Sequence, residues 1–364
     1  MSKIKIYTRI RPHVKQRYKS RPYEITAHEK DIYLFNERVN IMNERKVEKK
    51  RFGFDHIFDI DYTNEDIYYH IGRDLIDKFK KKKNSIFYVY GQTGSGKTYT
   101  LLGNDNNMGL LEMILSEMTT ISDNIKYSGI QIYNGKCYDL FTNTILKECE
   151  KSDGSIHFLN MSNYNLPKNV NNVIKSIKES RYVGVSSSNN ESSRSHLIFQ
   201  IINGDSYIQI VDLAGSERAC QSVKNKFSNM RENSDINLSI LAIKECIRSM
   251  TMRKKIPYRN SKITKILKNT FTNKVHTYIL STITPLKSDI IDTRNTLKYI
   301  SEMKNIKHQI LPPVSESRRN ILNNLNTNLN RELSKDKLER TVLLNLIEQN
   351  IKSLKDLKSN LINI

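Results

Sequence analysis

The spacing of apolar and polar residues predicts a succession of short strands and helices along most of the chain. Apolar runs and strict alternation favour strands, whereas apolar positions three and four residues apart favour helices. The expected strands are residues 3–9, 32–35, 52–59, 85–89, 129–133, 196–202, 207–211 and 277–283. The expected helices begin near residue 64 or span residues 108–119, 235–250, 261–270 and 288–303. Strands that alternate with helices predict a three-layer α/β domain.

Two short turn signals add detail to this pattern. Asn134-Gly135 directly follows one expected strand, and Asn203-Gly204-Asp205 separates two others. Asparagine and glycine readily adopt the backbone conformations that tight β-turns require. We therefore expect a turn at the first site and a hairpin at the second.

The pattern changes after Pro312-Pro313, where the chain becomes rich in Asn, Leu and Lys and contains no aromatic residue. Apolar residues then recur at heptad positions, with Asn350 at one of them: Leu343, Ile347, Leu354, Leu357, Leu361 and Ile364. We expect a globular domain over residues 1–308, a linker over 309–330 and a helix over 331–364. That helix fits a short coiled coil or a single helix folded back on the domain, so monomer and homodimer both stay open.

The charge balance indicates a polyanionic partner. The chain has 364 residues, a net charge of +21 and a pI near 9.6. Such an excess favours nucleic acid, an anionic membrane surface or an acidic protein polymer. The four cysteines show neither C-x-x-C nor zinc-ligand spacing, which argues for reduced thiols in a cytosolic or nuclear protein. No apolar run is long enough for a membrane span, and the N-terminus lacks the apolar core of a signal peptide.

A glycine-rich stretch follows the expected strand at residues 85–89. The sequence YGQTGSGKTYT, residues 90–100, contains the pattern Gly91-x-x-x-x-Gly96-Lys97-Thr98. In this pattern successive backbone N–H groups point at phosphate oxygens, the lysine reaches the terminal phosphates and the threonine hydroxyl binds magnesium. Glycine loses much backbone entropy on folding, so a cluster beside a strand indicates a shape that a Cβ would block. The stretch predicts a nucleoside triphosphate site; a glycine turn that merely exposes a lysine is the alternative.

Two further stretches hold groups for phosphoryl transfer, which must place magnesium, orient water and stabilise charge on the γ-phosphate. NNESSRSH, residues 189–196, offers Ser193 to the metal and Ser192 to the attacking water. VDLAGSE, residues 211–217, puts Asp212 at a strand end, where it can hold magnesium or its water, and follows it with a flexible glycine. Taken singly, the first stretch also fits a phosphorylatable surface loop, and the second fits a strand followed by a turn.

Together these stretches resemble the kinesin motor domain, over roughly residues 3–307. The matching segments are RIRP (9–12), FGFDHIFD (52–59), YVYGQTGSGKTYT (88–100), IQIYNGKCYDL (130–140), NNESSRSH (189–196), VDLAGSERA (211–219), NLSILAIKECI (237–247), IPYRNSKIT (256–264) and NTLKYI (295–300). Myosins share the three-part nucleotide logic but have longer motor domains and other flanking residues. The resemblance implies a P-loop NTPase-type three-layer domain, with a central, mostly parallel β-sheet flanked by helices.

The resemblance also implies an ATP hydrolase that uses Mg²⁺ and is stimulated by microtubules. The family's nucleotide-binding positions fall on Arg9, Arg11, Pro12, Gly91, Gln92, Thr93, Gly94, Ser95, Gly96, Lys97, Thr98, Tyr99 and Asn189. Its catalytic positions fall on Ser192, Ser193, Arg194, Gly215 and Glu217, where Arg194 and Glu217 resemble the switch ion pair. Its metal positions fall on Thr98, Ser193 and, through water, Asp212.

A microtubule-facing surface is implied around the long helix at residues 235–250. Basic residues gather there: Arg231, Lys244, Arg248, Arg253, Lys254, Lys255, Arg259, Lys262 and Lys265. Tubulin is acidic, so we expect a salt-sensitive contact. Nucleic acid is not expected, because no base-reading motif appears, and no membrane partner is expected. The implied location is the cytoplasm, on the microtubule cytoskeleton and its spindle.

Several sequence features bear on the subfamily within the kinesins, and they point in different directions. LAIKECIRSM, residues 241–250, resembles the internal-motor subfamily that depolymerises microtubule ends. Lys46-Val47-Glu48 is similar to that subfamily's Lys-Val-Asp tip, but in a loop that is short for the pattern. Leu238 replaces a lysine common in the family, and no conventional neck linker is evident after Lys307. An end depolymerase, a translocating motor dimerised through the C-terminal helix and a non-catalytic microtubule-binding protein therefore stay as alternatives.

Overall fold

The computed structural model describes residues 4–12, 25–39, 45–150, 156–182, 194–216, 228–252, 254–271, 275–304 and 348–351. The chain divides into two units, residues 1–307 and 308–364. In the second unit only residues 348–351 are described, and they are helical. The heptad residues expected to form a coiled coil lie outside the described residues, so that prediction is untested.

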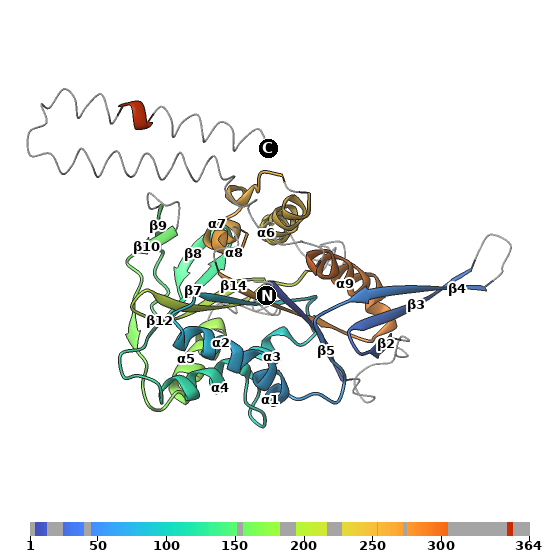
Figure 1. Cartoon of the computed structure of the whole chain (residues 1–364), viewed down its shortest axis with the longest axis horizontal. Coiled ribbons are helices and arrows are strands. Elements are labelled where there is room, and N and C mark those ends of the chain that lie inside the picture. Colours follow the sequence, from blue (N-terminus) through green and yellow to red (C-terminus); the bar gives the residue numbers. More distant parts are fainter. Residues whose placement is uncertain are drawn as a thin grey trace, which may run out of the picture. The chain divides into compact units, whose positions relative to one another are not determined.

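A nine-stranded sheet runs through the middle of the first unit (Figure 1). Its strands lie in the order β11-β7-β12-β13-β6-β14-β1-β5, and β8 pairs with β7 beside this path. The strands are β1 (Ile4–Ile10), β5 (His56–Phe58), β6 (Ser85–Tyr90), β7 (Lys126–Tyr133), β8 (Lys136–Asp139), β11 (Tyr164–Asn165), β12 (His196–Asn203), β13 (Ser206–Asp212) and β14 (His276–Ile283). Every residue of β6 is buried, as expected for an apolar strand covered on both faces.

The sheet is mixed in direction. β13, β6, β14, β1 and β5 pair in parallel, whereas β11, β8, β7, β12 and β13 pair antiparallel. The direction changes at the β12–β13 hairpin, which is the hairpin predicted around Gly204. The turn between β7 and β8 has positive φ at Asn134 (50°) and Gly135 (66°), as in a type I′ turn. The three-layer domain is thus confirmed, with parallel pairing confined to the half of the sheet that carries the glycine-rich loop.

Helices cover both faces of the sheet (Figure 1). One face is covered by α1 (Asn64–Ile67), the π-helix η1 (Tyr68–Gly72), α2 (Arg73–Lys80), α3 (Lys97–Leu102), α4 (Leu110–Met118) and α5 (Asn171–Tyr182). The other face is covered by α6 (Ser228–Thr251), α7 (Lys262–Ile266), α8 (Lys268–Phe271) and α9 (Ile290–Lys304), with the short 3₁₀ turns η4 (Tyr258–Asn260) and η5 (Lys287–Asp289) between them. Each helical layer shares its own apolar core with the sheet.

Two small sheets extend from this body. β2 (Ile25–His28), β3 (Asp31–Val39) and β4 (Arg45–Gly53) form one, and its long β3–β4 ribbon projects from the rest of the unit (Figure 1). β9 (Lys147–Glu150) pairs antiparallel with β10 (Ile156–Leu159) to form the other. Lys46-Val47-Glu48 lies on the paired strand β4, where Val47 is opposite Glu37, so the expectation of a short loop there is wrong.

Most expected elements are present with shifted ends. α6 begins at Ser228, whereas the prediction placed its start near residue 235. The prediction was late because the first turns are polar and show no apolar spacing. The helix expected over residues 261–270 is divided at Leu267, whose ψ of 15° ends α7. Among the described residues Cys137, Cys149 and Cys246 are free thiols. None of the helices described here has the length and apolar character that would let it cross a membrane.

Candidate functional site

The glycine-rich loop connects β6 to α3 and has a backbone that only glycine fits. Gly91 has a φ of 158°, and a Cβ placed on it would lie 2.3 Å from the carbonyl oxygen of Thr282 on the neighbouring strand β14. Gly96 has a φ of 104°, which other residues rarely adopt. The glycine cluster is therefore explained by a close approach to β14 and by a left-handed turn ahead of α3.

Side chains of the loop hold its shape from inside. The Lys97 ammonium donates hydrogen bonds of 2.8 Å to the carbonyl oxygens of Gly91 and Gln92, and the lysine is 6% exposed. The Ser95 hydroxyl bonds to the carbonyl oxygen of Gln92 at 2.7 Å and to the hydroxyl of Thr282 at 2.6 Å. A loop fixed in this way presents a preformed concave backbone, which is what recognition of phosphate oxygens requires.

Thr98, in the first turn of α3, meets Asp212 at the end of β13. The Thr98 hydroxyl donates to Asp212 Oδ2 at 3.1 Å, and Asp212 is 1% exposed. The other carboxylate oxygen, Oδ1, is buried and has no hydrogen-bond partner among the described residues. A hydroxyl beside a carboxylate with an open oxygen is the donor set that Mg²⁺ favours, directly or through water. These residues therefore fit the metal predicted for them.

Asp212 also has a partner that the sequence analysis missed. Arg181 of α5 donates from Nη1 to Asp212 Oδ2 at 2.5 Å, and the two side chains are 4% and 1% exposed. The signal is present in the sequence, because Arg181 continues the buried stripe of Val173, Ile174 and Ile177 at helical spacing. A charged residue on such a stripe indicates a buried ion pair.

Arg9 contacts three residues around the start of α3. Its guanidinium donates to Asn64 Oδ1 at 2.6 Å and to the Thr100 hydroxyl at 2.7 Å, and it lies 5.4 Å from the centre of the Tyr99 ring. Burial lowers the pKa of Arg9 from its ordinary value. Arg11 donates to the carbonyl oxygen of Gly94 and so joins β1 to the glycine-rich loop. Arg9 thus acts as a brace under Tyr99.

These groups line a single cleft of about 990 Å³. Ten of the thirteen predicted nucleotide-binding residues line it: Arg9, Arg11, Pro12, Thr93, Gly94, Ser95, Gly96, Lys97, Thr98 and Tyr99. Gly91 and Gln92 lie deeper, under Lys97, and Asn189 is outside the described residues. The sequence analysis missed the opposite wall, formed by residues 60–65 and by Asn104, Asn106, Asn107 and Met108. Within that wall Asn64 donates to the carbonyl oxygens of Tyr99 and Met108, at 3.2 and 2.8 Å.

The predicted switch residues are described only in part. Ser192, Ser193 and Glu217 lie outside the described residues, so the expected Arg194–Glu217 pair is untested. Gly215 is buried after the end of β13. The backbone N–H of its neighbour Ser216 donates to the carbonyl oxygen of Gly91 at 3.1 Å. The DLAG loop, residues 212–215, is thus tied to the glycine-rich loop.

The predicted basic surface gathers on and around α6, η4 and α7. Lys254, Lys255 and Arg248 are exposed. Arg259 pairs with Glu150 of β9 at 2.8 Å, and Lys262 pairs with Glu148 of the same strand. Two of the expected tubulin contacts are therefore partly neutralised within the chain. Arg253 and the side chain of Arg231 are outside the described residues, and Lys265 lies half-buried on α7.

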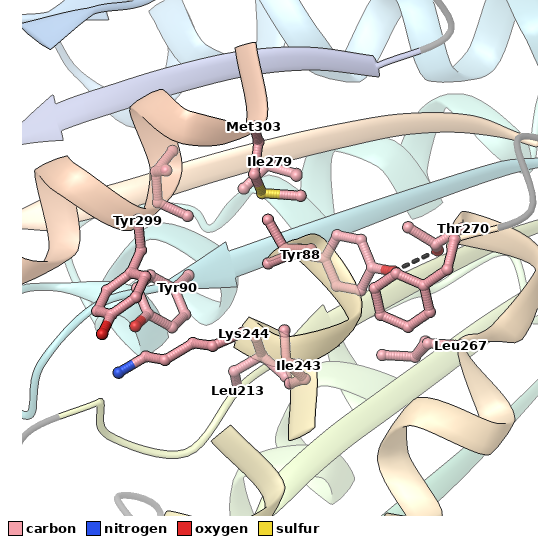
Figure 2. A pocket seen from close by; sticks show the side chains of 13 residues that line it. Tyr88, Tyr90, Leu213, Ile243, Lys244, Leu267, Thr270, Ile279, Tyr299 and Met303 are labelled. Atoms are coloured by element: carbon pink, nitrogen blue, oxygen red, sulfur yellow. Dashed lines mark hydrogen bonds between the residues drawn. The ribbon is translucent and has the colours of Figure 1, made fainter. Parts of the chain in front are cut away.

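Lys244 differs from the other basic residues of this face. It is half-buried, and its ammonium lies 4.2 Å from the centre of the Tyr299 ring on α9. Figure 2 shows the two side chains at one end of a small apolar cavity between α6, α9 and the sheet. Lys244 therefore contacts α9, whereas a residue that binds tubulin directly would project outward.

Comparison with known proteins gives this site a family. A family model described as the kinesin motor domain matches residues 9–306. Human Kinesin-like protein KIF24 is 31% identical over 345 residues, which cover 88% of this chain and 25% of the relative. Kinesin-like protein KIN-13B of Arabidopsis thaliana is 29% identical over 327 residues, covering 84% and 48%. Kinesin-related protein 10 of Dictyostelium discoideum is 29% identical over 341 residues, covering 81% and 27%.

The chain thus spans between about a quarter and about half of the length of these curated relatives. Solved structures share its fold. The C-terminal motor and motor homology domain of Kar3Vik1, fused to a synthetic heterodimeric coiled coil, has a TM-score of 0.68 at 26% identity over 83% of this chain and 85% of its own. A KIF14 dimer, in a two-heads-bound state with AMP-PNP and a microtubule, has a TM-score of 0.71 at 22% identity over 84% and 94%. With the family match extending from the end of β1 through the glycine-rich loop and the DLAG loop to α9, the chain belongs to the kinesin motor domain family.

Proposed function

We propose that this protein is a microtubule-stimulated ATPase that couples the state of its nucleotide to its grip on the microtubule. The observation that carries the proposal is the meeting of three parts at the carboxyl ends of the central strands β6 and β13. The preformed glycine-rich loop, the Thr98–Asp212 pair and the DLAG loop are joined by the hydrogen bond from Ser216 N to the Gly91 carbonyl oxygen. A loop tied to the phosphate cradle is placed to respond when the γ-phosphate is lost.

The residues in and beside the cleft have different proposed roles in phosphoryl transfer. Bound Mg²⁺ would supply positive charge to the phosphate oxygens, and Thr98 and Asp212 would hold it. Lys97 and the loop amides would bind the phosphates, and Tyr99, braced by Arg9, would stack on the base. Gly215 offers a backbone N–H to the γ-phosphate. Ser192, Ser193, Arg194 and Glu217 keep their proposed roles in placing water and metal and in closing the site.

The proposed partner is the microtubule, bound by the face that carries α6, η4 and α7. Exposed Arg248, Lys254 and Lys255 support a contact with an acidic polymer. The proposed location is accordingly the cytoplasm, on the microtubule cytoskeleton and the spindle. Neither nucleic acid nor a membrane is proposed as a partner, and the proposal applies equally to a monomer and a homodimer.

For the mechanical output we propose depolymerisation of microtubule ends. The Lys-Glu-Cys sequence at residues 244–246 resembles the internal-motor subfamily, and the projecting β3–β4 ribbon carries Lys46-Val47-Glu48 close to its far end. Val47 is two ladder pairs from the last pair, Val39 with Arg45. A ribbon of this reach favours a contact with a curved tubulin end, beyond the area that α6 covers.

The test uses fluorescent, stabilised microtubules with the purified chain and ATP. We expect ends to shorten in ATP and not in AMP-PNP, with ATP turnover stimulated by microtubules. Gliding on a coated surface without shortening would instead identify a translocating motor. Binding without turnover would identify a non-catalytic microtubule-binding protein and would overturn the proposal.

A ribbon variant separates end depolymerisation from ATP hydrolysis. Replacing Lys46, Val47 and Glu48 with alanine is expected to lower the shortening rate by about tenfold, because one contact of about 1 to 2 kcal/mol is lost. ATP turnover without microtubules should stay unchanged. Lys175→Ala, on α5 across the sheet, is the control and should have no effect on either rate. Unchanged shortening in the ribbon variant would exclude this role for the ribbon.

A further inference from the structure

His196 contacts two different parts of the motor with one side chain. It begins β12, directly after the segment that contains Arg194, and is 3% exposed. Its Nδ1 accepts a hydrogen bond of 3.1 Å from the backbone N–H of Ala214 in the DLAG loop. Its Nε2 lies 2.7 Å from the hydroxyl oxygen of Ser239 on α6. The imidazole therefore lies between the loop that follows β13 and the helix of the basic face.

The chemistry of these groups fixes the direction of every hydrogen bond. A backbone N–H can only donate, so Nδ1 of His196 accepts from Ala214 and the ring proton of the neutral imidazole lies on Nε2. That proton is donated to Ser239, because the Ser239 hydroxyl already donates to the carbonyl oxygen of Ile236 at 2.7 Å. The chain runs from Ala214 through His196 and Ser239 to Ile236, and each of these groups has a partner.

The imidazole is neutral over the physiological range. Complete burial lowers the pKa of His196 to about 4, and the positive charges of Arg181 and Lys97 act in the same direction against the opposing effect of Asp212. A neutral ring has only one proton to place. The single arrangement described above is therefore the one present at neutral pH.

Breaking the hydrogen bond at either end of this series, at Ala214 or at Ser239, is costly. Ser239 is 8% exposed and Ala214 is fully buried, so a broken bond would leave a buried polar group without a partner. The apolar contact beside it is less demanding. Leu213 and Ile243 line one apolar cavity (Figure 2), and apolar contacts of this kind have no preferred direction. The directional link between the DLAG loop and α6 is therefore the pair of hydrogen bonds through His196.

We propose that His196 is a positioning residue that couples the DLAG loop to α6, so that loss of the γ-phosphate changes the grip of α6 on the microtubule. The inference rests on the proposed function and extends it, because it names the side chains through which the two sites communicate. His196 touches neither the cleft nor the basic surface, so its effect is on the coupling between them. Ser239 is the helix end of the link.

Ser239→Ala tests the coupling, because it removes the acceptor on α6 while leaving the cleft intact. We expect ATP turnover without microtubules to stay within about twofold of the parent, as no group in the cleft changes. Stimulation by microtubules should fall by about tenfold, the size expected from one buried hydrogen bond. The ratio of microtubule affinities in AMP-PNP and in ADP should shrink by the same factor.

Two companion variants distinguish coupling from damage. Ser249→Ala makes the same change ten residues along α6 and should behave like the parent. His196→Gln keeps a donor towards Ser239 but loses the acceptor for Ala214, and it should reduce stimulation as Ser239→Ala does, while still unfolding in one cooperative transition at a somewhat lower melting temperature than the parent. Normal stimulation in folded Ser239→Ala and His196→Gln, or equal losses in Ser249→Ala, would overturn the inference. A parent protein whose microtubule affinity is the same in AMP-PNP and ADP would instead overturn the proposed function.

Discussion

Arg181 and Asp212 form the most deeply buried ion pair of the described residues, and Asp212 also faces Thr98 in the proposed metal site. Charge is expensive to bury, and a carboxylate held by arginine is fixed in place. The ion pair therefore restricts the position of the Asp212 carboxylate in the proposed metal site. Its open Oδ1 is the oxygen that stays available.

Replacing Asp212 alone should be more harmful than replacing both partners. Asp212→Asn is expected to lower the free energy of unfolding by about 3 kcal/mol, because the buried guanidinium of Arg181 loses the carboxylate beside it. Combining it with Arg181→Met should recover most of that loss. Urea unfolding at neutral pH measures both changes. A double variant as unstable as Asp212→Asn would show that the cost is not electrostatic.

An exposed pair on the same helix is the control for this experiment. Lys175 and Glu179 lie 3.9 Å apart with side chains 75% and 62% exposed. Surface pairs of this kind contribute between about 0 and 1 kcal/mol. Lys175→Met should therefore change the free energy of unfolding by much less than Asp212→Asn.

At the scale of elements, β9 holds basic residues of the proposed microtubule face in ion pairs. Glu150 binds Arg259 of η4, and Glu148 binds Lys262 of α7. Both glutamates belong to a small two-stranded sheet beside that face. β9 therefore competes with tubulin carboxylates for the same cations.

Releasing one of these cations should strengthen microtubule binding. Glu150→Gln is expected to raise microtubule affinity by about two- to threefold at low salt, since an exposed ion pair contributes only a fraction of a kcal/mol to about 1 kcal/mol. Co-sedimentation in the presence of AMP-PNP measures the change. Glu179→Gln alters the net charge equally but on the opposite helical layer, and it should leave affinity unchanged. Equal gains in both variants would assign the effect to overall charge.

Elements with a strong local signal were predictable, and elements held by distant contacts were not. Asn134-Gly135 and the Gly204 turn specify their turns through backbone conformation alone, so both were predicted correctly. The β9–β10 pair was not predicted, because its strands are short and lack a clear apolar pattern. The start of α6 was missed for the same reason.

The candidate site shows the same division. The glycine-rich loop and Asp212 belong to motifs that are continuous in sequence; the loop lines the cleft, and Asp212 accepts a hydrogen bond from Thr98. Arg181 contacts Asp212 across 31 positions of the chain, and Asn64 contacts Tyr99 of the glycine-rich loop across 35, which sequence spacing does not reveal. Ser192, Ser193, Glu217 and Asn189 lie outside the described residues, so their roles stay predictions.

At the scale of the whole molecule, charge and coupling should respond differently to salt. The net charge of +21 gives long-range attraction to an acidic polymer, and ions screen such attraction beyond about 8 to 10 Å. The hydrogen-bonded chain through His196 is buried and is not reached by ions. Binding strength and nucleotide response are therefore separable properties of this protein.

Raising the salt concentration from about 50 to about 200 mM is expected to weaken microtubule binding by about tenfold or more, because exposed charges are screened over this range. The ratio of affinities in AMP-PNP and in ADP should change by less than about twofold. Titrations with fluorescent microtubules at each salt concentration measure both quantities. If the ratio of affinities in AMP-PNP and in ADP fell together with the affinity itself, the nucleotide response would depend on surface charge.

At its open end the β12–β13 hairpin joins the stretch at residues 189–196 and the DLAG loop, and at its closed end it has the Gly204-Asp205 turn. The two ends are about 20 to 25 Å apart, given the rise of a strand. A dye or a small peptide tag inserted at that turn would therefore be fixed to the central sheet, through β7 and β6, and would lie far from the nucleotide. The turn is therefore a suitable site for labelling or immobilising the protein without changing a residue of the cleft.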